Sequence, residues 1–380
     1  MKVERLNASH YDEILSLLNA VFSCKNGREM DFEKEMPKMC VRDDEHMGCH
    51  FGIFDNDRLV ACMGVYPFEV RVAGEKLCFA TTGNIAVHWE YEGNGYMGKM
   101  VDAAMEELER LDVDAARLGG LRSRYNRYGF ESCGQNYGFT FTQKNRERKF
   151  LEYKGGITFK RITAEDTAAL EFTVSIYNKN KIIIPRNIQN AYSCLTMWQN
   201  IPYIAIENGT PIGYLSATES GDAIAEVDAV DTNALTNIIC AWQEKVNQNI
   251  FFYRQAHQID SLRVFTAVCE GAQIYSPSHF KIRKWEKVVD AFMKLKASYS
   301  EMAKGELCIE IENYGIVRLF SNENGVGCEK VNKNPDIVLD RLSAARYIFG
   351  PHPPVFTLDA PPIAQAWFPL PLSWNGQDRL

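Results

Sequence analysis

The chain has 380 residues, of which 46% are hydrophobic and 24% charged, and this composition predicts an ordinary globular protein of two or three domains. Lys and Arg number 42 against 49 Asp and Glu, a formal net charge of −7, so neither nucleic acid nor an anionic membrane is expected as the main partner. The N-terminus carries no signal region and no apolar run reaches bilayer length, so we expect a cytoplasmic protein that does not cross a membrane.

The 11 cysteines are scattered without C-x-x-C pairs, which is typical of thiols kept reduced inside cells. His46, Cys49 and His50 crowd one segment, but no second pair of ligands follows at the spacing of a zinc site. No metal is therefore expected.

The chain opens with a strand-like segment, Val3 to Leu6, and a helix that Ser9 can cap and that carries Ile14, Leu15, Leu18 and Phe22 on one side. Residues 24–49 are polar and acidic, which favours a solvated face over short helices at a substrate entrance. Residues 50–88 are apolar runs separated by turn residues at 55–57 and 73–75, which predicts an antiparallel meander.

A glycine-rich turn follows the meander and leads into a helix. Gly93, Gly95 and Gly98 let backbone N–H groups face a ligand at the positive end of the helix, whose apolar residues recur at three- and four-residue spacing from Met97 to Leu111. This pattern predicts a pyrophosphate cradle. A nucleotide-triphosphate loop is excluded because Met100 stands where that motif needs Ser or Thr, and a dinucleotide fold would alternate strands with helices instead of placing a meander first.

The strand, turn and helix together resemble motif A of the GNAT acetyltransferases, which binds acetyl-CoA. Glu92 stands where that motif has Arg or Gln, which predicts weakened binding of CoA, and the large Met97 is similar to the turn of the Eis-like branch of the superfamily. The resemblance implies that the cosubstrate contacts a set of backbone positions: Ile85, Ala86, Val87, Gly93, Asn94, Gly95, Tyr96, Met97, Gly98, Gly120 and Leu121.

The segment Tyr125-Asn126-Arg127-Tyr128-Gly129-Phe130 resembles the Y-x-R-F-G-Y segment of Eis-like enzymes. The resemblance implies that Tyr125 is the general acid. The alternative, that Tyr125 only packs, is the more common role of a tyrosine, but its position after a motif-A helix favours catalysis.

The rest of the chain predicts two further units and a docked tail. Residues 157–162 repeat the strand-helix opening and Asn208-Gly209 predicts a hairpin, but Asp231 to Ala234 cannot form a glycine cradle, so we expect a degenerate GNAT-like copy that does not bind CoA. From about residue 282 the pattern resembles a sterol-carrier-like domain. The apolar groove of such a domain could bind a lipid, but the family resemblance favours a structural role for the domain. The aromatic, proline-rich ending predicts a packed tail, and the Eis-like resemblance implies that the carboxylate of Leu380 enters the active site as general base.

We therefore expect an α/β (α+β) protein with mixed, mostly antiparallel sheets flanked by helices. Its expected domains are a catalytic GNAT domain (1–150), a degenerate GNAT-like domain (151–284) and a sterol-carrier-like domain with the tail (285–380). The expected activity is transfer of an acetyl group from acetyl-CoA to a primary amine of a small molecule or peptide, through a ternary complex. The alternative is a scaffold or lipid-binding protein with a decayed CoA site. The resemblance also implies a homo-oligomer, with a hexamer as one such state.

Overall fold

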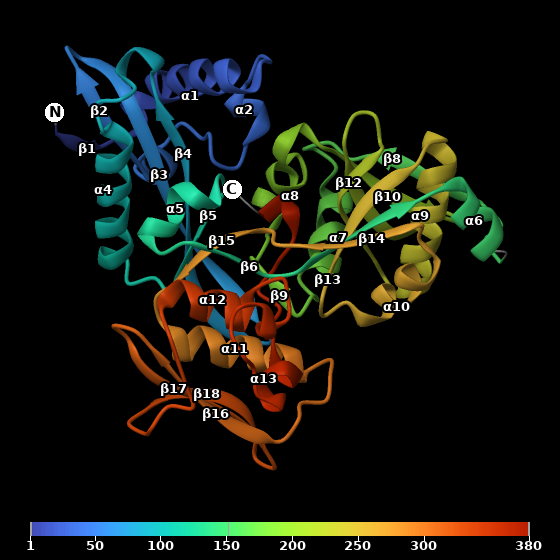
Figure 1. The fold of residues 1–380 in the computed structure, drawn as a ribbon. Coiled ribbons are helices and arrows are strands. Elements are labelled where there is room, and N and C mark those ends of the chain that lie inside the picture. Colours follow the sequence, from blue (N-terminus) through green and yellow to red (C-terminus); the bar gives the residue numbers. More distant parts are fainter. Residues whose placement is uncertain (1, 151, 379–380) are drawn as a thin grey trace.

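The structure, a computed structural model, describes residues 2–150 and 152–378, and it is built on three sheets (Figure 1). We call each sheet with its covering helices a unit. The first sheet has eight strands in the order β1-β2-β3-β4-β5-β15-β6, with β9 paired to β3. Its strands are β1 (Val3–Arg5), β2 (His50–Asp55), β3 (Arg58–Val72), β4 (Glu75–Val87), β5 (Ala115–Leu118), β6 (Glu131–Cys133), β9 (Ile182–Ile183) and β15 (Ser278–Ile282).

The predicted meander is confirmed: β2, β3 and β4 pair antiparallel in chain order. Asn56 and Asp57 form the first turn with positive φ, and Ala73 and Gly74 form the second. Apolar side chains alternate between the two faces of β3, so that Cys62 and Tyr66 pack under α1 (Tyr11–Asn26) and Met63 and Val65 pack under α4 (Tyr96–Arg110). The two helices thus cover opposite faces of this sheet (Figure 1).

Several short helices complete the first unit. They are α2 (Phe32–Glu35), α3 (Asp44–Met47) and α5 (Arg122–Tyr125), with 3-10 turns η1 (Ala8–His10), η2 (Trp89–Tyr91) and η3 (Asn126–Tyr128), whereas α6 (Gln143–Lys149) packs against the second unit. The expected cap at Ser9 is wrong, because Asn7 caps the 3-10 turn from which α1 continues and its side chain accepts a hydrogen bond from the Ser9 amide. Residues 24–49 do contain short helices.

The second sheet has seven strands in the order β14-β7-β13-β12-β11-β10-β8. The strands are β7 (Asn136–Phe141), β8 (Ile157–Arg161), β10 (Ile201–Glu207), β11 (Thr210–Ala217), β12 (Ala223–Ala229), β13 (Ile250–Gln255) and β14 (Gly271–Tyr275). The helices are α7 (Thr167–Tyr177), α8 (Ile188–Leu195), the 3-10 turn η4 (Met197–Gln199), α9 (Thr232–Val246) and α10 (Ile259–Val268). Asn208 and Gly209 both have positive φ between β10 and β11, so the predicted hairpin is confirmed.

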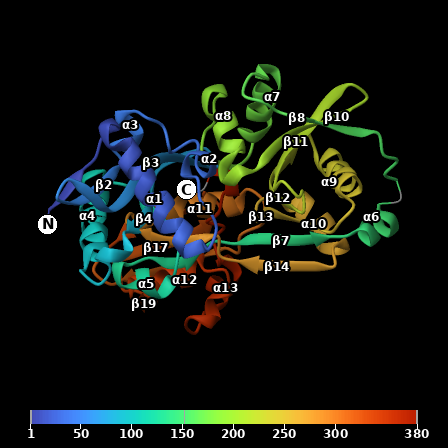
Figure 2. The same ribbon diagram turned by 90° about the horizontal axis from the view of Figure 1, so that it is seen from above.

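The first two sheets exchange a strand. β7 follows β6 of the first sheet directly in the chain but pairs with β13 and β14 of the second, and β7 and β14 run side by side in Figure 2. In return, β15 leaves the second unit and pairs with β5 and β6. The sheets therefore do not divide at residues 150 and 284, because residues 136–141 and 278–282 each belong to the neighbouring sheet.

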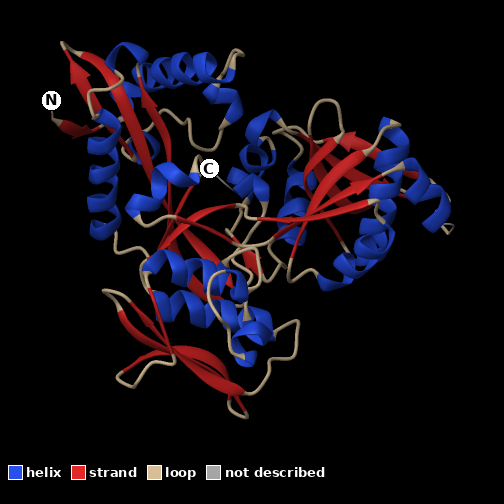
Figure 3. Ribbon diagram, in the orientation of Figure 1, coloured by secondary structure: helices blue, strands red, loops and turns tan. Residues whose placement is uncertain are grey.

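The third sheet has the order β18-β17-β16-β19, and its position below the first sheet is plain in Figure 3. Its elements are α11 (Trp285–Ala297), β16 (Gly305–Ile311), β17 (Gly315–Asn322), β18 (Gly325–Val331), β19 (Ile337–Leu339), α12 (Arg341–Phe349), η5 (Pro354–Phe356) and α13 (Pro362–Trp367). The last 3-10 turn, η6 (Gly376–Asp378), packs against α8 and β12 of the second unit. One hydrophobic core joins α11 and α12 to the far ends of β3 and β4. The expected class of mixed, mostly antiparallel sheets with helices is confirmed, whereas the sterol-carrier-like resemblance stays a prediction.

Within residues 2–150 and 152–378, no helix combines the length and the apolar character that crossing a bilayer requires.

Candidate active site

The glycine turn lies where β4 and β5 separate. These strands pair in parallel only between Phe79–Thr82 and Ala115–Leu118, so the remainder of β4, including Ile85 to Val87, diverges from β5. Beyond β4, Gly93 and Gly95 have φ of 82° and 74°, and a Cβ at either would meet nothing within 4 Å. Gly95 is the N-cap of α4 and has no side chain with which to satisfy the first amides of the helix. The turn thus combines open space with the positive end of the α4 helix dipole, and both features suit the binding of a pyrophosphate.

A β-bulge interrupts β4 just before this turn. The register runs from Gly64 opposite Gly83 to Cys62 opposite Ala86, so two residues of β4, Asn84 and Ile85, face the single residue Met63 of β3. Asn84 has φ of 54°, a left-handed conformation that Asn tolerates better than most side chains. A bulge of this kind leaves the extra residue unpaired in the ladder, at the part of β4 that diverges from β5.

A buried chain of hydrogen bonds fixes the bulge from behind. Asn84 Nδ2 donates to Tyr66 Oη at 2.7 Å, and Tyr66 Oη lies 2.8 Å from His50 Nε2. His50 Nδ1 lies 3.3 Å from the Met47 carbonyl, which can only accept, so Nδ1 carries the proton and Nε2 accepts from the tyrosine. Burial lowers the pKa of His50 to about 4, which keeps the ring neutral near pH 7.

Removal of the Tyr66 hydroxyl, which lies between His50 and Asn84 in this chain of hydrogen bonds, should therefore destabilise the bulge. We expect Tyr66→Phe to lower the free energy of unfolding by about 1–3 kcal/mol, because His50 Nε2 would be left buried without its partner and the half-buried Asn84 Nδ2 would lose its acceptor. Chemical denaturation measures this change. Tyr253→Phe, at an exposed tyrosine of the second sheet, is the control and should change stability little; equal losses in the two variants would contradict the role of the chain.

Tyr125 lies at the end of α5, beside the start of the opening. It is 5% exposed, and a Cβ on Gly120 would come within 3.1 Å of its ring, so the glycine permits the tyrosine to pack against the backbone after β5. Burial raises the pKa of the Tyr125 hydroxyl. The group is therefore protonated at neutral pH and can donate a proton.

The tyrosine segment and the glycine turn also approach one another. A Cβ at Gly98 would lie 3.9 Å from Tyr128 Oη, and that hydroxyl accepts a hydrogen bond from Arg127 Nη2 at 3.0 Å. Lys99, in the first turn of α4, holds its ammonium group 5.7 Å from the ring centroid of Tyr96. Two cations thus flank the turn, although Glu92 to Asn94 contribute none.

The end of the chain is packed between the first and second units. Trp374 is buried with its ring edge-on to Phe79 and Phe280 of the first sheet, with centroids 5.5 Å apart in each case. Three residues later Gln377 is buried too, and its carbonyl accepts a hydrogen bond from Lys38 Nζ at 3.3 Å. Burial lowers the pKa of Lys38. The predicted packing of the tail is thus observed up to Asp378, while Leu380 lies outside the described residues.

The equivalent opening in the second unit is built differently. β12 and β13 are also parallel and pair only at Ala223 and Ile224, and α9 follows β12. Here, however, Asp231 caps the helix, and its carboxylate accepts a hydrogen bond from the Ala234 amide at 2.8 Å. An anion at this helix end would meet a carboxylate where the first unit presents Gly95.

Sequence reasoning missed two sets of residues that the fold brings together. His50, Tyr66 and Asn84 form the chain behind the bulge, and Arg186, Glu226 and Asp378 form an ion cluster around the tail. The asparagine at position 84, within an otherwise apolar strand, is the local sequence signal for the bulge, since Asn is enriched at positive φ. Among the described residues no three His, Cys, Asp or Glu side chains lie together as a metal site.

Comparison with known proteins agrees with this geometry. Residues 2–133 match the family model of the acetyltransferase (GNAT) domain. No curated protein sequence matches the chain. The family match confirms a GNAT domain over residues 2–133, while its predicted end at residue 150 stays a prediction.

Solved structures share the fold over nearly the whole chain. A probable N-acyltransferase from Enterococcus faecalis V583 is similar with a TM-score of 0.68 and 16% identity, covering 100% of this chain and 97% of its own. A GCN5-related N-acetyltransferase from Anabaena variabilis gives 0.67 and 14%, covering 97% of each chain. Eis1 from Mycobacterium abscessus gives 0.63 and 14%, covering 99% of this chain and 98% of its own. The domain match and these neighbours support an acyltransferase that uses an acyl-CoA cosubstrate.

Proposed function

We propose that the protein is an N-acetyltransferase that moves an acetyl group from acetyl-CoA to a primary amine of a small molecule or peptide. The observation that carries the proposal is the meeting of three features at the opening between β4 and β5: the bulge at Asn84, the positive-φ glycines before α4, and the buried Tyr125. In this proposal Gly93 to Gly98 hold the pyrophosphate. Ile85 to Val87, with Gly120 and Leu121, line the pantetheine and the acetyl group.

The chemistry requires two proton transfers. The amine, with a pKa near 10, must lose a proton as its nitrogen bonds to the acetyl carbon, and the sulfur of CoA must gain one as the C–S bond breaks. We assign the first proton to the carboxylate of Leu380 and the second to the hydroxyl of Tyr125. The carboxylate becomes an adequate base only where burial raises its pKa, which is consistent with the packed tail that precedes it.

The missing basic run at Glu92 to Asn94 favours the second candidate, a scaffold whose CoA site has decayed. Lys99 and Arg127 support the first candidate, because they supply positive charge beside the turn from outside it. Isothermal titration with acetyl-CoA separates the two: binding favours the enzyme, and no heat at millimolar ligand favours the scaffold. A screen of amines for release of the CoA thiol then identifies the acceptor. We also propose, as the sequence predicts, three domains over residues 1–150, 151–284 and 285–380, and a homo-oligomer.

A charged side chain in the glycine turn should abolish binding of acetyl-CoA. In Gly95→Glu the carboxylate would enter the free space at the end of α4 and repel the pyrophosphate, and the positive φ would add about 1–2 kcal/mol of strain. Calorimetry should show one site per chain in the wild type and none in the variant.

Gly209→Glu is the matched control, since Gly209 has a similar φ of 79° and equally open surroundings in the hairpin of the second unit. It should lose comparable stability and keep its affinity for acetyl-CoA. Two sites per chain in the wild type, with one surviving in Gly95→Glu, would contradict the assignment of the second unit as degenerate.

A further inference from the structure

The second unit has a polar pocket where β12 and β13 diverge. The pocket has a volume of about 490 Å³, and its wall is formed mainly by the ends of these strands, the first turns of α9 and α10, and residues 179–181 after α7. It is the counterpart of the opening between β4 and β5, because α9 follows β12 as α4 follows β4. We call it the β12–β13 pocket. The residues that we assign to acetyl-CoA do not line it.

Arg254, at the end of β13, is a buried cation with incomplete hydrogen bonding. Its side chain is 6% exposed, Nε donates to Ser261 Oγ at 3.0 Å, and Nη1 donates to the Val227 carbonyl at 2.8 Å. Nη2 has no hydrogen-bond partner among residues 2–150 and 152–378, and Asp228 Oδ1 lies 4.0 Å from it. One nitrogen of the guanidinium is therefore open to a ligand in the pocket that Arg254 lines.

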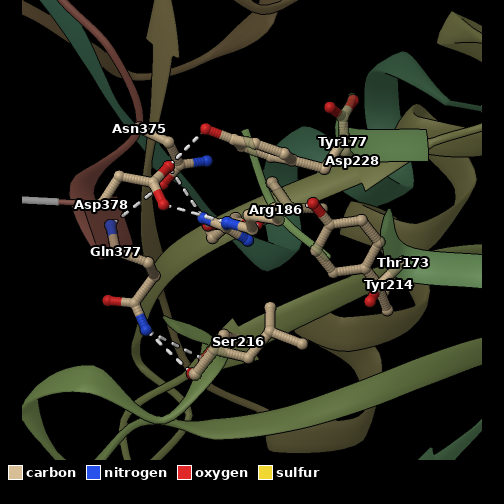
Figure 4. A network of polar contacts seen from close by, with 12 residues as sticks. Thr173, Tyr177, Arg186, Tyr214, Ser216, Asp228, Asn375, Gln377 and Asp378 are labelled. Carbon is tan, nitrogen blue, oxygen red and sulfur yellow. Dashed lines mark hydrogen bonds and ion pairs between the residues drawn. The ribbon is translucent and has the colours of Figure 1, made fainter. Parts of the chain in front are cut away.

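Another buried arginine of the second unit is fully paired. Arg186 donates to both oxygens of Glu226 at 2.7 Å and to both oxygens of Asp378 at 2.9 Å (Figure 4). Arg254 also keeps its charge, because a guanidinium does not lose its proton in proteins, although burial lowers its pKa. A buried cation is costly unless it is paired, so the open nitrogen of Arg254 suits an anionic group of a ligand.

Two further groups beside Arg254 can donate hydrogen bonds to the same anion. His257 is 8% exposed, and its Nε2 is buried without a hydrogen-bond partner in the described parts of the chain. Burial and the charge of Arg254 lower the pKa of His257 to about 3, so the ring is neutral and carries one N–H. α10 begins after Gln258 without a side-chain cap, so its first amides and the positive end of its dipole lie at the pocket.

The pocket also carries negative charge. Its charged side chains are four cations, Lys179, Lys181, Arg254 and Arg263, and three carboxylates, Asp228, Asp231 and Asp260. Asp231 and Asp260 are exposed at the starts of α9 and α10, where they would repel a phosphate dianion and attract an ammonium group. A lining of nearly balanced charge therefore favours a ligand that carries one charge of each sign.

We propose that the β12–β13 pocket binds a small zwitterion of the amino-acid class. The ligand carboxylate lies against Arg254 Nη2, His257 and the first amides of α10, and the ligand ammonium lies near Asp231. The site is independent of the proposed function, because it shares no residue with the opening of the first unit. The second unit thus keeps the cleft of a GNAT-like copy but uses it for another kind of ligand.

Thermal unfolding of the full chain with the common L-amino acids, added one at a time, tests the proposal. We expect at least one of them to raise the melting temperature by about 2 °C or more, since a ligand that binds only the folded state stabilises it. Acetate and ethylamine, which each carry one of the two charges, should raise it less at the same concentration. Calorimetry with the stabilising amino acid then gives its Kd.

Two pocket variants and one matched control locate the site. Arg254→Gln should weaken binding of the amino acid at least about tenfold, because a hydrogen bond to a charged group is lost. Asp231→Asn should weaken it about twofold to fivefold and keep the fold, because Asn caps a helix as well as Asp does. Asp340→Asn makes the same exchange at the cap of α12 in the third unit and should leave the Kd unchanged.

The outcomes separate this inference from the proposed function. No shift with any amino acid, an equal shift with acetate alone, or an unchanged Kd in both pocket variants overturns the pocket. If Arg254→Gln does not fold, Arg254→Lys, which keeps the charge and loses the fork, replaces it. Gly95→Glu should lose acetyl-CoA and keep the amino acid; loss of both ligands would place the amino acid in the first unit instead. A wild type that binds no acetyl-CoA overturns the proposed function alone.

Discussion

Replacing Tyr125 by Phe should lower kcat by about 10²- to 10⁴-fold, the usual contribution of a general acid. The affinity for acetyl-CoA should stay nearly the same, because the change removes one hydroxyl and keeps the ring that packs beside Gly120. A fall in kcat and kcat/KM by the same factor is the signature of an interaction made only in the transition state. Steady-state kinetics with a thiol-detecting assay, together with calorimetry, measures both quantities.

The pH dependence gives a second check on the same residue. Because burial raises the pKa of Tyr125, its hydroxyl stays protonated through neutral and moderately alkaline pH, and loss of the acid should not limit the rate there. The variant should therefore be slower at every pH in that range, with little change in the shape of the profile.

Tyr347→Phe is a suitable control for Tyr125→Phe. Tyr347 is fully buried in the third unit, and its hydroxyl has no hydrogen-bond partner among residues 2–150 and 152–378. Its replacement should leave kcat unchanged. If Tyr125→Phe also kept full kcat, Tyr125 would only pack, and the proton for the thiolate would have to come from another group.

The local parts of the fold could be predicted because local residues specify them. Asn56-Asp57 and Ala73-Gly74 are turn formers between apolar runs, so the meander follows from a few neighbouring side chains. The helix after Gly95 follows likewise from apolar spacing, and its buried apolar residues Met100, Val101, Ala104 and Leu108 lie on the expected side.

The exchange of strands between the sheets could not be predicted in this way. β7 and β15 each carry the alternating pattern of an ordinary half-buried strand, and either would fit either sheet. Which partner a strand takes depends on contacts such as Phe280 with Trp374, almost a hundred positions further along the chain, and no spacing within the strand encodes them. The division of the chain at residues 150 and 284 rested on local changes in composition and so did not foresee the exchange.

The candidate site was predictable to the extent that it is contiguous. Gly93 to Gly98 and Tyr125 stand within short segments that resemble known motifs. Arg186 and Asp378, by contrast, are 192 residues apart, and neither is unusual in its own segment. Their significance comes from burial, which only the folded chain reveals.

Extending the chain beyond Leu380 should nearly abolish turnover while leaving the fold intact. The extension would turn the terminal carboxylate into a neutral peptide bond and move the new terminus away from the opening, since Gln377 and Asp378 are held in place and cannot shift to compensate. We expect a loss of about 10²-fold or more in kcat if the carboxylate is the base. The melting temperature should change little, because the extension leaves the buried contacts of Gln377 and Asp378 in place.

Two controls isolate the charge from the added bulk. The same residues attached at the N-terminus should leave kcat unchanged, and a semisynthetic protein that ends in a carboxamide should lose activity without gaining a residue. Replacing Leu380 by another apolar residue should have a small effect, because the carboxylate and not the side chain accepts the proton. Full activity in the extended protein would reject the carboxylate as base. Attention would then move to Glu33, which accepts a hydrogen bond from Tyr11 Oη at 2.9 Å, because Asp378 is already committed to Arg186.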